Sequence, residues 1–250
     1  MPVDYTKYRQ SPLEQARIGD MLRVLPRNRA TVLEVGARDG YISHLLTRNF
    51  GAVIALDLEK PEFEFPRVTP VKGDATGLQF PDNSFDVVCC MEVLEHIPPD
   101  KLKQACQELS RVARNEVLIG VPYRQDTRLG RTTCSGCGRK NPPWGHVSFF
   151  DEDRLRELFP ELRPISVTFV GETRARTNWL SVLLLDLAGN PWGTYDQEEP
   201  CQFCGIALMA PSRKSMAERL LAWVAVRLDQ VQSRPTASQP LWIHILFQKP

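Results

Sequence analysis

The sequence lacks three features that would place it in a class at once: an excess of charge of one sign, a long hydrophobic run and an apolar N-terminal segment. Lys and Arg total 31 against 30 Asp and Glu, which gives a net charge of +1. This balance predicts no broad basic surface, so neither nucleic acid nor a membrane is an expected partner. The apolar run from Trp179 to Leu185 ends at Asp186 and is too short to span a bilayer.

The first ten residues, MPVDYTKYRQ, contain no apolar core of the kind found in signal peptides. We therefore expect a cytoplasmic protein whose cysteines are reduced. No internal repeat and no low-complexity tract is evident in the sequence. At 250 residues the chain is long enough for one large α/β domain, or for one domain with an insertion.

The seven cysteines are better interpreted as core residues or metal ligands than as disulfides. Cys89, Cys90 and Cys106 lie among apolar residues and are expected in the core. The other four form two Cys-x-x-Cys-Gly motifs, at Cys134 and Cys137 and at Cys201 and Cys204. This spacing lets one turn present two thiolates to a tetrahedral Zn²⁺, and four thiolates leave no open position, so the zinc would be structural. A redox-active Cys-x-x-Cys is the alternative for either pair alone.

The stretch from Thr31 to Tyr41, TVLEVGARDGY, predicts a buried strand, a turn with two glycines and the start of a helix. Such a turn exposes unpaired backbone N–H groups, and small residues at Gly36, Ala37 and Gly40 let a ligand approach them. The pattern therefore predicts binding of a nucleotide-like cofactor. An ordinary tight connection between a strand and a helix is the alternative.

Strands and helices alternate in the rest of the first half. Apolar runs predict further strands at 53–56, 68–72, 85–91 and 117–121, with helices after Ser11 and after Pro98. This alternation predicts a parallel sheet with helices on both faces, in which ligands lie beyond the carboxyl ends of the strands. Five residues fall at such ends: Glu34, Gly36, Asp57, Asp74 and Met91.

Two of these carboxylates suit different parts of a nucleotide. Asp57 directly follows a buried strand, where its carboxylate can accept bonds from two ribose hydroxyls. Asp74 can accept a bond from an exocyclic amino group of a base, and Ala75 leaves room for the ring. The alternative for both acids is an ordinary turn residue.

Four features together resemble the class I S-adenosylmethionine-dependent methyltransferases. They are the acid two residues before the first glycine, the acid that ends the second strand, Asp-Ala after the third strand, and Glu-Val-Leu-Glu-His after the fourth. The resemblance covers Thr31 to Pro122 closely and implies a doubly wound, seven-stranded, mostly parallel Rossmann-like sheet. It implies a cofactor site formed by Glu34, Gly36, Ala37, Gly40, Asp57, Leu58, Asp74, Ala75 and Met91. Arg38 stands where the family usually has a glycine, and Arg38 and Tyr41 stand where an NAD-type Gly-x-Gly-x-x-Gly would need glycines.

Two histidines are candidates for proton transfer. Glu95 and His96 are candidate catalytic residues. In the family that the sequence resembles, however, their segment is more like a junction between strand and helix whose side chains are bonded locally. His146 lies in a Gly-His-Val pattern that recurs in bacterial members with paired cysteine knuckles. It can take a proton from a hydroxyl or amine, or it can fix its loop through a local hydrogen bond.

The second half predicts fewer regular elements. Asp151 is the expected N-cap of a short helix, 164–170 is the expected sixth strand, and 241–247 is an expected last strand. The resemblance implies that this last strand is antiparallel and lies beside the sixth. The run 179–187 is either a strand or a buried helix, and 206–209 a short strand. From Arg213 a helix is expected whose apolar face holds Ala217, Leu220, Leu221, Val224, Leu228 and Val231. Its charges are mixed in sign, which disfavours a membrane-surface role.

These observations predict one class I methyltransferase domain over residues 1–250. Zinc-knuckle insertions are expected at 123–150, after the fifth strand, and at 190–212, with the terminal helix and last strand at 213–250. The predicted activity is transfer of a methyl group from S-adenosylmethionine to an oxygen or nitrogen of a small molecule or biosynthetic intermediate. The alternative is a zinc-stabilised binding module on an inactive methyltransferase fold, docking a protein or carrier. Nucleic-acid methylation is disfavoured by the neutral charge and by the absence of an Asn-Pro-Pro-Tyr-like tetrad.

Overall fold

The computed structural model describes residues 6–211, 215–234 and 237–250, and the chain divides into two compact units. The first unit consists of the chain up to Tyr123 together with Phe150–Gly171 and Pro240–Pro250. The second consists of Arg124–Phe149 and Glu172–Gln239. The expected division into one methyltransferase domain with two zinc-binding insertions stays a prediction.

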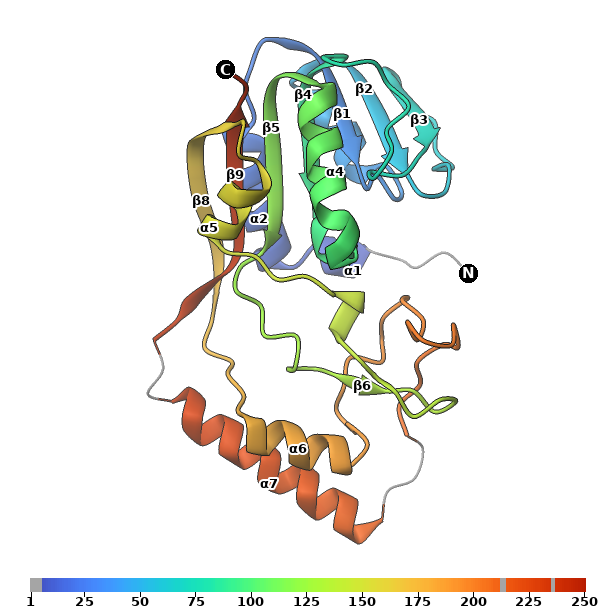
Figure 1. Ribbon diagram of the computed structural model, residues 1–250, viewed down its shortest axis with the longest axis vertical. Helices are drawn as coiled ribbons and strands as arrows, with labels where there is room; N and C mark the ends of the chain where they lie inside the picture. The colour runs from blue at the N-terminus through green and yellow to red at the C-terminus, as the bar shows by residue number, and fades with distance from the viewer. Residues whose placement is uncertain (1–5, 212–214, 235–236) are drawn as a thin grey trace. The chain divides into compact units, whose positions relative to one another are not determined.

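A seven-stranded sheet forms the centre of the first unit (Figure 1). Its strands, in spatial order, are β3 (Val68–Lys72), β2 (Phe50–Asp57), β1 (Arg29–Val35), β4 (Phe85–Met91), β5 (Ala113–Pro122), β9 (Gln239–Gln248) and β8 (Arg163–Thr173). The pairs from β3 to β5 are parallel, whereas β9 runs antiparallel to β5. The predicted Rossmann-like sheet is confirmed, and the antiparallel last strand lies between the fifth and sixth.

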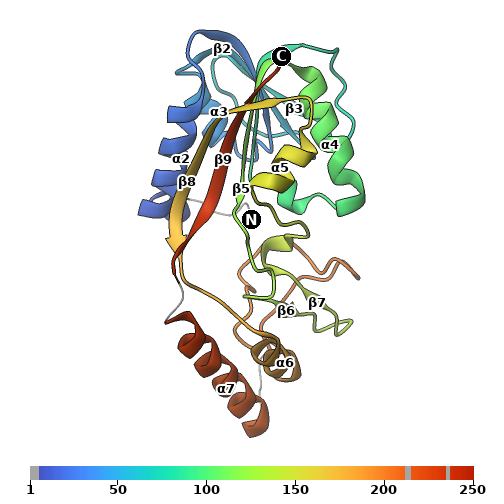
Figure 2. The ribbon, with the colours of Figure 1, turned by 60° about the vertical axis from the view of Figure 1, so that its left-hand side comes forward.

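Helices cover both faces of this sheet, with α2 (Pro12–Val24) on one side and α4 (Pro99–Val112) and α5 (Glu152–Leu158) on the other (Figure 2). Neighbouring residues of β4 alternate between two hydrophobic cores, with Cys89 in the core under α2 and Cys90 in the core under α4. This alternation follows from the two-residue period of a strand, and both faces are buried because helices cover both. Cys106 is buried with Cys90, so the prediction of three core cysteines is confirmed.

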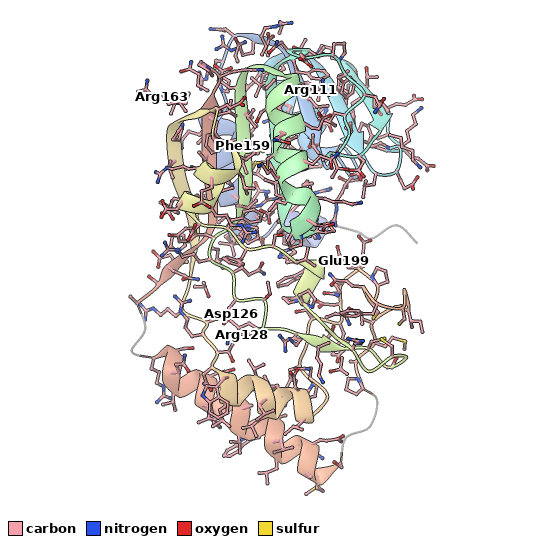
Figure 3. All side chains as sticks on the ribbon, in the orientation of Figure 1. Arg111, Asp126, Arg128, Phe159, Arg163 and Glu199 are labelled. Atoms are coloured by element: carbon pink, nitrogen blue, oxygen red, sulfur yellow. The ribbon has the colours of Figure 1, made fainter. Side chains whose placement is uncertain are left out.

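The predicted helix starts are confirmed by their caps. The Ser11 hydroxyl accepts a hydrogen bond from Glu14 N at 3.2 Å, and Pro12 is the first residue of α2. Asp151 accepts one from Arg154 N at 3.0 Å and thereby caps α5. Phe159, directly after α5, lies with its ring 5.0 Å from that of Phe247 in β9 (Figure 3). Two shorter helices, α1 (Thr6–Arg9) and α3 (Tyr41–Leu46), and the 3₁₀ turn η1 (Leu94–His96) complete this unit.

The second unit contains a small hairpin and two packed helices. Its elements are β6 (Thr132–Thr133), β7 (Lys140–Asn141), the 3₁₀ turn η2 (Pro143–Gly145), α6 (Trp179–Leu187) and α7 (Met216–Ser233). Residues 179–187 thus form a helix rather than a strand, but the expectation that this helix is buried was wrong, since Trp179 and Leu187 are exposed. Asn178 caps α6 by accepting bonds from Leu180 N and Ser181 N. In the parts of the chain that the structure describes, no helix has both the length and the apolar composition needed to cross a membrane.

Two further predictions for this unit were wrong. Residues 206–209 form no strand, because the Ile206 carbonyl turns back to accept a bond from Cys201 N at 2.9 Å. The face of α7 that packs on α6 holds Ala222 and Ala225, while Leu220 and Val231 of the expected apolar face are exposed. Small side chains let the two helix backbones approach closely, and the Ser181 hydroxyl donates to the Ala225 carbonyl at 3.2 Å. The expected helix start at Arg213 lies outside the described residues.

Candidate functional site

The turn after β1 has the backbone conformation that its glycines predict. Gly36 and Gly40 have φ angles of +87° and +78°, which side-chain-bearing residues rarely adopt. A Cβ on Gly36 would collide with Val93, and one on Gly40 would lie 2.5 Å from the Phe63 ring. Arg38, where the family usually has a glycine, also has a positive φ of +46°. The turn therefore keeps its shape despite that departure.

Asp57 ties the ends of the first two strands together. Its Oδ2 accepts a hydrogen bond from Arg38 N at 2.7 Å, and its Oδ1 accepts one from Leu58 N at 2.7 Å. The turn is anchored to β2 a second time, because Gly36 N and Ala37 N both donate to the Leu56 carbonyl. Each carboxylate oxygen has a second lone pair, so Asp57 can still accept from a ligand. Leu58 is exposed beside it.

Glu34 lies one residue before the end of β1 and is buried. Its carboxylate accepts a hydrogen bond from the Ser43 hydroxyl of α3. Burial raises the pKa of Glu34 to about 8, and the nearby acids Asp57 and Asp39 act in the same direction. The side chain thus links the glycine turn to the helix that follows it.

Asp74 and Ala75 follow β3 at the same edge of the sheet. The Asp74 Oδ1 accepts bonds from Thr76 N and from the Thr76 hydroxyl, both at 2.8 Å. These two bonds leave the exposed Asp74 side chain oriented by its own turn. Ala75 is buried beneath it.

Met91 and Glu92 mark the end of β4. The Met91 side chain packs over Gly120 of β5, where an added Cβ would lie 2.6 Å from the Met91 sulfur. Glu92 has a positive φ of +56°, and its Oε2 accepts a bond from Trp242 Nε1 at 2.9 Å. Burial raises the pKa of Glu92 to about 7, although Arg17 lies 4.0 Å from its Oε1.

Sequence reasoning gave no role to Glu92. The signal was present, since Glu92 follows an apolar strand in the same way as Asp57 follows β2. A partly buried carboxyl group on a strained backbone, with a pKa near neutrality, is typical of sites that exchange protons.

Glu95 and His96 lie together in η1. Neither carboxyl oxygen of Glu95 has a hydrogen-bond partner among the described residues, so the expected local bonding of this side chain is not observed. Burial raises the pKa of Glu95 well above its usual value and lowers that of His96 to about 4.

The four cysteines of the two knuckles meet in the second unit. All four sulfur atoms lie within 4.8 Å of one another, with Cys134 Sγ 3.6 Å from Cys204 Sγ and Cys137 Sγ 3.6 Å from Cys201 Sγ. Tetrahedral Zn²⁺ with Zn–S bonds of about 2.3 Å requires sulfur separations of about 3.8 Å, so the cluster has the right size. The backbone N–H groups of Cys137 and Gly136 lower the pKa of the Cys134 thiol, which favours a thiolate ligand.

The two knuckles repeat one backbone pattern. Gly138 N donates to the Cys134 carbonyl and Gly205 N to the Cys201 carbonyl, each at 2.9 Å. Both glycines have positive φ angles, +70° and +72°, and nothing lies within 4 Å of either Cβ position. These glycines are therefore needed for the turn conformation rather than for a close contact.

His146 belongs to the second unit, after η2. Its Nδ1 lies 2.6 Å from Gln125 Oε1, and its side chain is buried. The local hydrogen bond expected as one interpretation is thus present, and its catalytic role stays a prediction.

Comparisons with known proteins agree with this geometry. Residues 33–119 match the family model described as a methyltransferase domain. The ubiquinone biosynthesis O-methyltransferase of Xylella fastidiosa is 31% identical over 111 residues, which cover 39% of this chain and 44% of that protein. The human mitochondrial arginine-hydroxylase NDUFAF5 is 28% identical over 224 residues, covering 84% of this chain and 61% of that protein. The chain thus spans less than two thirds of the length of these two relatives.

Solved structures show the same fold. A putative methyltransferase from Bacillus halodurans superposes with a TM-score of 0.57 at 13% identity, covering 93% of this chain and 98% of that one. The YcgJ protein of Bacillus subtilis gives a TM-score of 0.56 at 17% identity, covering 93% of this chain and 97% of that one. The chain therefore combines a methyltransferase-domain match over residues 33–119 with the fold of these solved structures, and the last strand of its sheet along the chain is antiparallel.

Proposed function

We propose that this protein transfers a methyl group from S-adenosylmethionine. The observation that carries the proposal is the position of Asp57, whose two oxygens hold the glycine turn and the end of β2 while keeping lone pairs for a ligand. A vicinal diol such as that of ribose presents two donors at a spacing that one carboxylate can accept. The first unit thus offers the acceptor that the adenosyl group requires.

The other residues of this edge fit the remaining parts of the cofactor. Gly36, Ala37 and Gly40 would leave room for its methionine part, and Glu34 would orient the turn. Asp74 and Ala75 would hold the adenine, Leu58 would cover the ribose, and Met91 would lie near the sulfur. When bound, the cofactor supplies a methyl group activated by the positive sulfur, so the protein mainly has to align the acceptor with it, which is worth up to about 7–11 kcal/mol of the barrier.

The acceptor in this proposal is an oxygen or nitrogen of a small molecule or biosynthetic intermediate. Where the acceptor carries a proton that it must lose on methylation, Glu92 at the end of β4 is a candidate base, because burial raises its pKa to about 7. His146 is the second candidate base. The Xylella relative, named for O-methylation in ubiquinone biosynthesis, supports an acceptor of this kind.

Calorimetric titration of the purified protein with S-adenosylmethionine tests the cofactor site. We expect wild-type protein to bind and Asp57→Ala to lose on the order of a hundredfold in affinity, because two charge-assisted hydrogen bonds are removed. Asp100→Asn is the matched control, since Asp100 is exposed on the first turn of α4 and should bind as wild type. No heat from the wild-type protein would favour the alternative of a binding module on an inactive fold.

The human relative suggests a second chemistry. It is named as an arginine hydroxylase and aligns with 84% of this chain, so arginine is an alternative substrate. Mass spectrometry of candidate acceptors separates the two outcomes. Methyl transfer adds a net CH₂ unit and releases S-adenosylhomocysteine. Hydroxylation with molecular oxygen and an added two-electron reductant adds one oxygen atom, releases water and releases no S-adenosylhomocysteine.

We propose that Cys134, Cys137, Cys201 and Cys204 hold a structural Zn²⁺. The sulfur separations and the two matched knuckles support it. Metal analysis of protein purified without added zinc should find about one equivalent per chain. Less than about half an equivalent, with freely titratable thiols, would contradict this assignment.

A further inference from the structure

The outer face of α7 is apolar, which is the reverse of what a surface helix needs. Met216, Leu220, Trp223 and Val231 recur at helical spacing and are 81%, 61%, 54% and 64% exposed. The opposite face packs on α6 through Ala222 and Ala225 (Figure 1). A helix with apolar residues on both faces is stable only when both are covered, so the outer face is suited to a further contact.

The charges of α7 are sorted between its two faces. Glu218 belongs to the capping box with Ser215, and Asp229 accepts a bond from the Thr177 hydroxyl at 3.3 Å, so both acids are engaged. Glu218 and Asp229 each lie four residues from one of the two buried alanines, Ala222 and Ala225, and seven residues from the other. This spacing places both acids on the helix face toward α6. Arg227 lies instead on the exposed face, with its guanidinium 5.5 Å from the Trp223 ring. The exposed face therefore combines apolar side chains with positive charge.

A hollow of about 540 Å³ adjoins the C-terminal end of α7 and carries further positive charge. Three arginines line it, Arg174, Arg176 and Arg234, against one acid, Asp229. Arg176 is oriented by its bond to Gln239 Oε1 at 2.8 Å. Nearby, Arg128 pairs with Asp126 at 2.7 Å, and Figure 3 shows the two side chains together. The hollow has an excess of cationic donors, which suits a phosphate group.

We propose that α7 docks this protein on the surface of an anionic lipid bilayer. Met216, Leu220, Trp223 and Val231 would enter the boundary between headgroups and acyl chains, and the arginines would bind lipid phosphates. A second copy of the chain fits this face less well, because two such helices would bring their arginines together. The exposed Trp179, Leu183 and Leu187 of α6 add uncharged apolar surface to the same helix pair. This inference does not depend on the proposed methyl transfer.

Co-sedimentation of the full chain with vesicles tests the proposal. Phosphatidylcholine vesicles that contain about a third phosphatidylglycerol should bind the protein at least about tenfold more strongly than pure phosphatidylcholine, and high salt should weaken the binding. Leu220→Gln and Arg227→Glu should each lower the partition coefficient severalfold or more. Ile165→Gln and Arg163→Glu are matched controls on β8 of the first unit, where Ile165 and Arg163 are exposed, and should bind as wild type.

Two results would overturn the proposal. One is wild-type protein that stays in the supernatant with both vesicle types, and the other is binding that the α7 variants leave unchanged. A concentration-dependent dimer that Leu220→Gln dissociates, without vesicle binding, would assign the face to self-association instead. Thermal melting and zinc content, measured on each variant, ensure that the comparison is made between folded proteins.

Discussion

At the scale of single residues, Glu34 makes stability depend on pH. Burial raises its pKa in the folded protein to about 8, whereas in the unfolded chain the pKa is near 4.5. Between these values the folded protein holds a proton that the unfolded chain has lost, so raising the pH favours unfolding. We expect the melting temperature of cofactor-free protein to fall from about pH 5 to about pH 9, and to fall less in Glu34→Gln, which cannot ionise.

Thermal melting across this range, followed by circular dichroism, checks the prediction. Glu62→Gln is the control, since Glu62 is exposed and its variant should follow the wild-type curve. Parallel curves for wild type and Glu34→Gln would show that the buried carboxyl group does not govern this dependence.

Two glycines of the first unit should respond to alanine in opposite directions. Gly40→Ala would need a left-handed backbone and would place a Cβ 2.5 Å from the Phe63 ring, so we expect a loss of about 1–3 kcal/mol in the free energy of unfolding. Gly19 lies within α2 with nothing within 4 Å of its Cβ position, so Gly19→Ala should gain about 0.5–1 kcal/mol. Urea denaturation measures both, and equal effects of the two changes would contradict the assignment of Gly40 to a strained turn.

At the scale of elements, the contact between α6 and α7 depends on small residues. Ala225→Leu would insert a large side chain where the Ser181 hydroxyl meets the Ala225 carbonyl, and we expect a loss of about 1–3 kcal/mol. Ala217→Leu is the matched control, because Ala217 is exposed on the same helix and should change stability by less than about 0.5 kcal/mol. Hydrogen exchange of the α6 and α7 backbone amides measures the loss of stability. Equal protection of these amides in Ala225→Leu and Ala217→Leu would count against this contact.

The contact between α6 and α7 could not be predicted from the sequence, in contrast to the strands of the sheet. β1, β2 and β4 were predictable because each contains a short apolar run that ends at or just before a Gly, Asp or Glu. The buried face of α7 could not be predicted from the sequence, because apolar residues occupy most of the helix circumference. Contacts with α6 decide which of these residues are buried. Since 179–187 was compatible with strand or helix, that partner was itself undetermined.

Some residues of the candidate site could likewise be predicted from the sequence, and others could not. Asp57, Asp74 and the glycine turn were predictable because their positions follow directly from strand ends. Glu92 was not, because its unusual environment comes from Arg17 and Trp242, which are 75 residues before it and 150 after it. Contacts of this range leave no local pattern in the sequence.

At the scale of the whole molecule, the two units should differ in their response to metal removal. A chelator would take away the cross-link among the four cysteines, so we expect residues 132–141 and 201–208 to lose hydrogen-exchange protection while the sheet of the first unit keeps it. Exchange measured by mass spectrometry before and after chelation checks this, and adding Zn²⁺ back should restore protection. Loss of protection in β1 and β4 at the same rate would show that the units unfold together.

The order of the strands also has a consequence for biosynthesis. β9, which lies between β5 and β8, leaves the ribosome after β8 and after all of the second unit up to Gln239. Until then the nascent chain carries an open groove in its sheet, with the unpaired edge of β5 on one side. A truncation that ended the chain at Gln239 would leave that groove permanently empty, and such a product would be a target for chaperones and proteases.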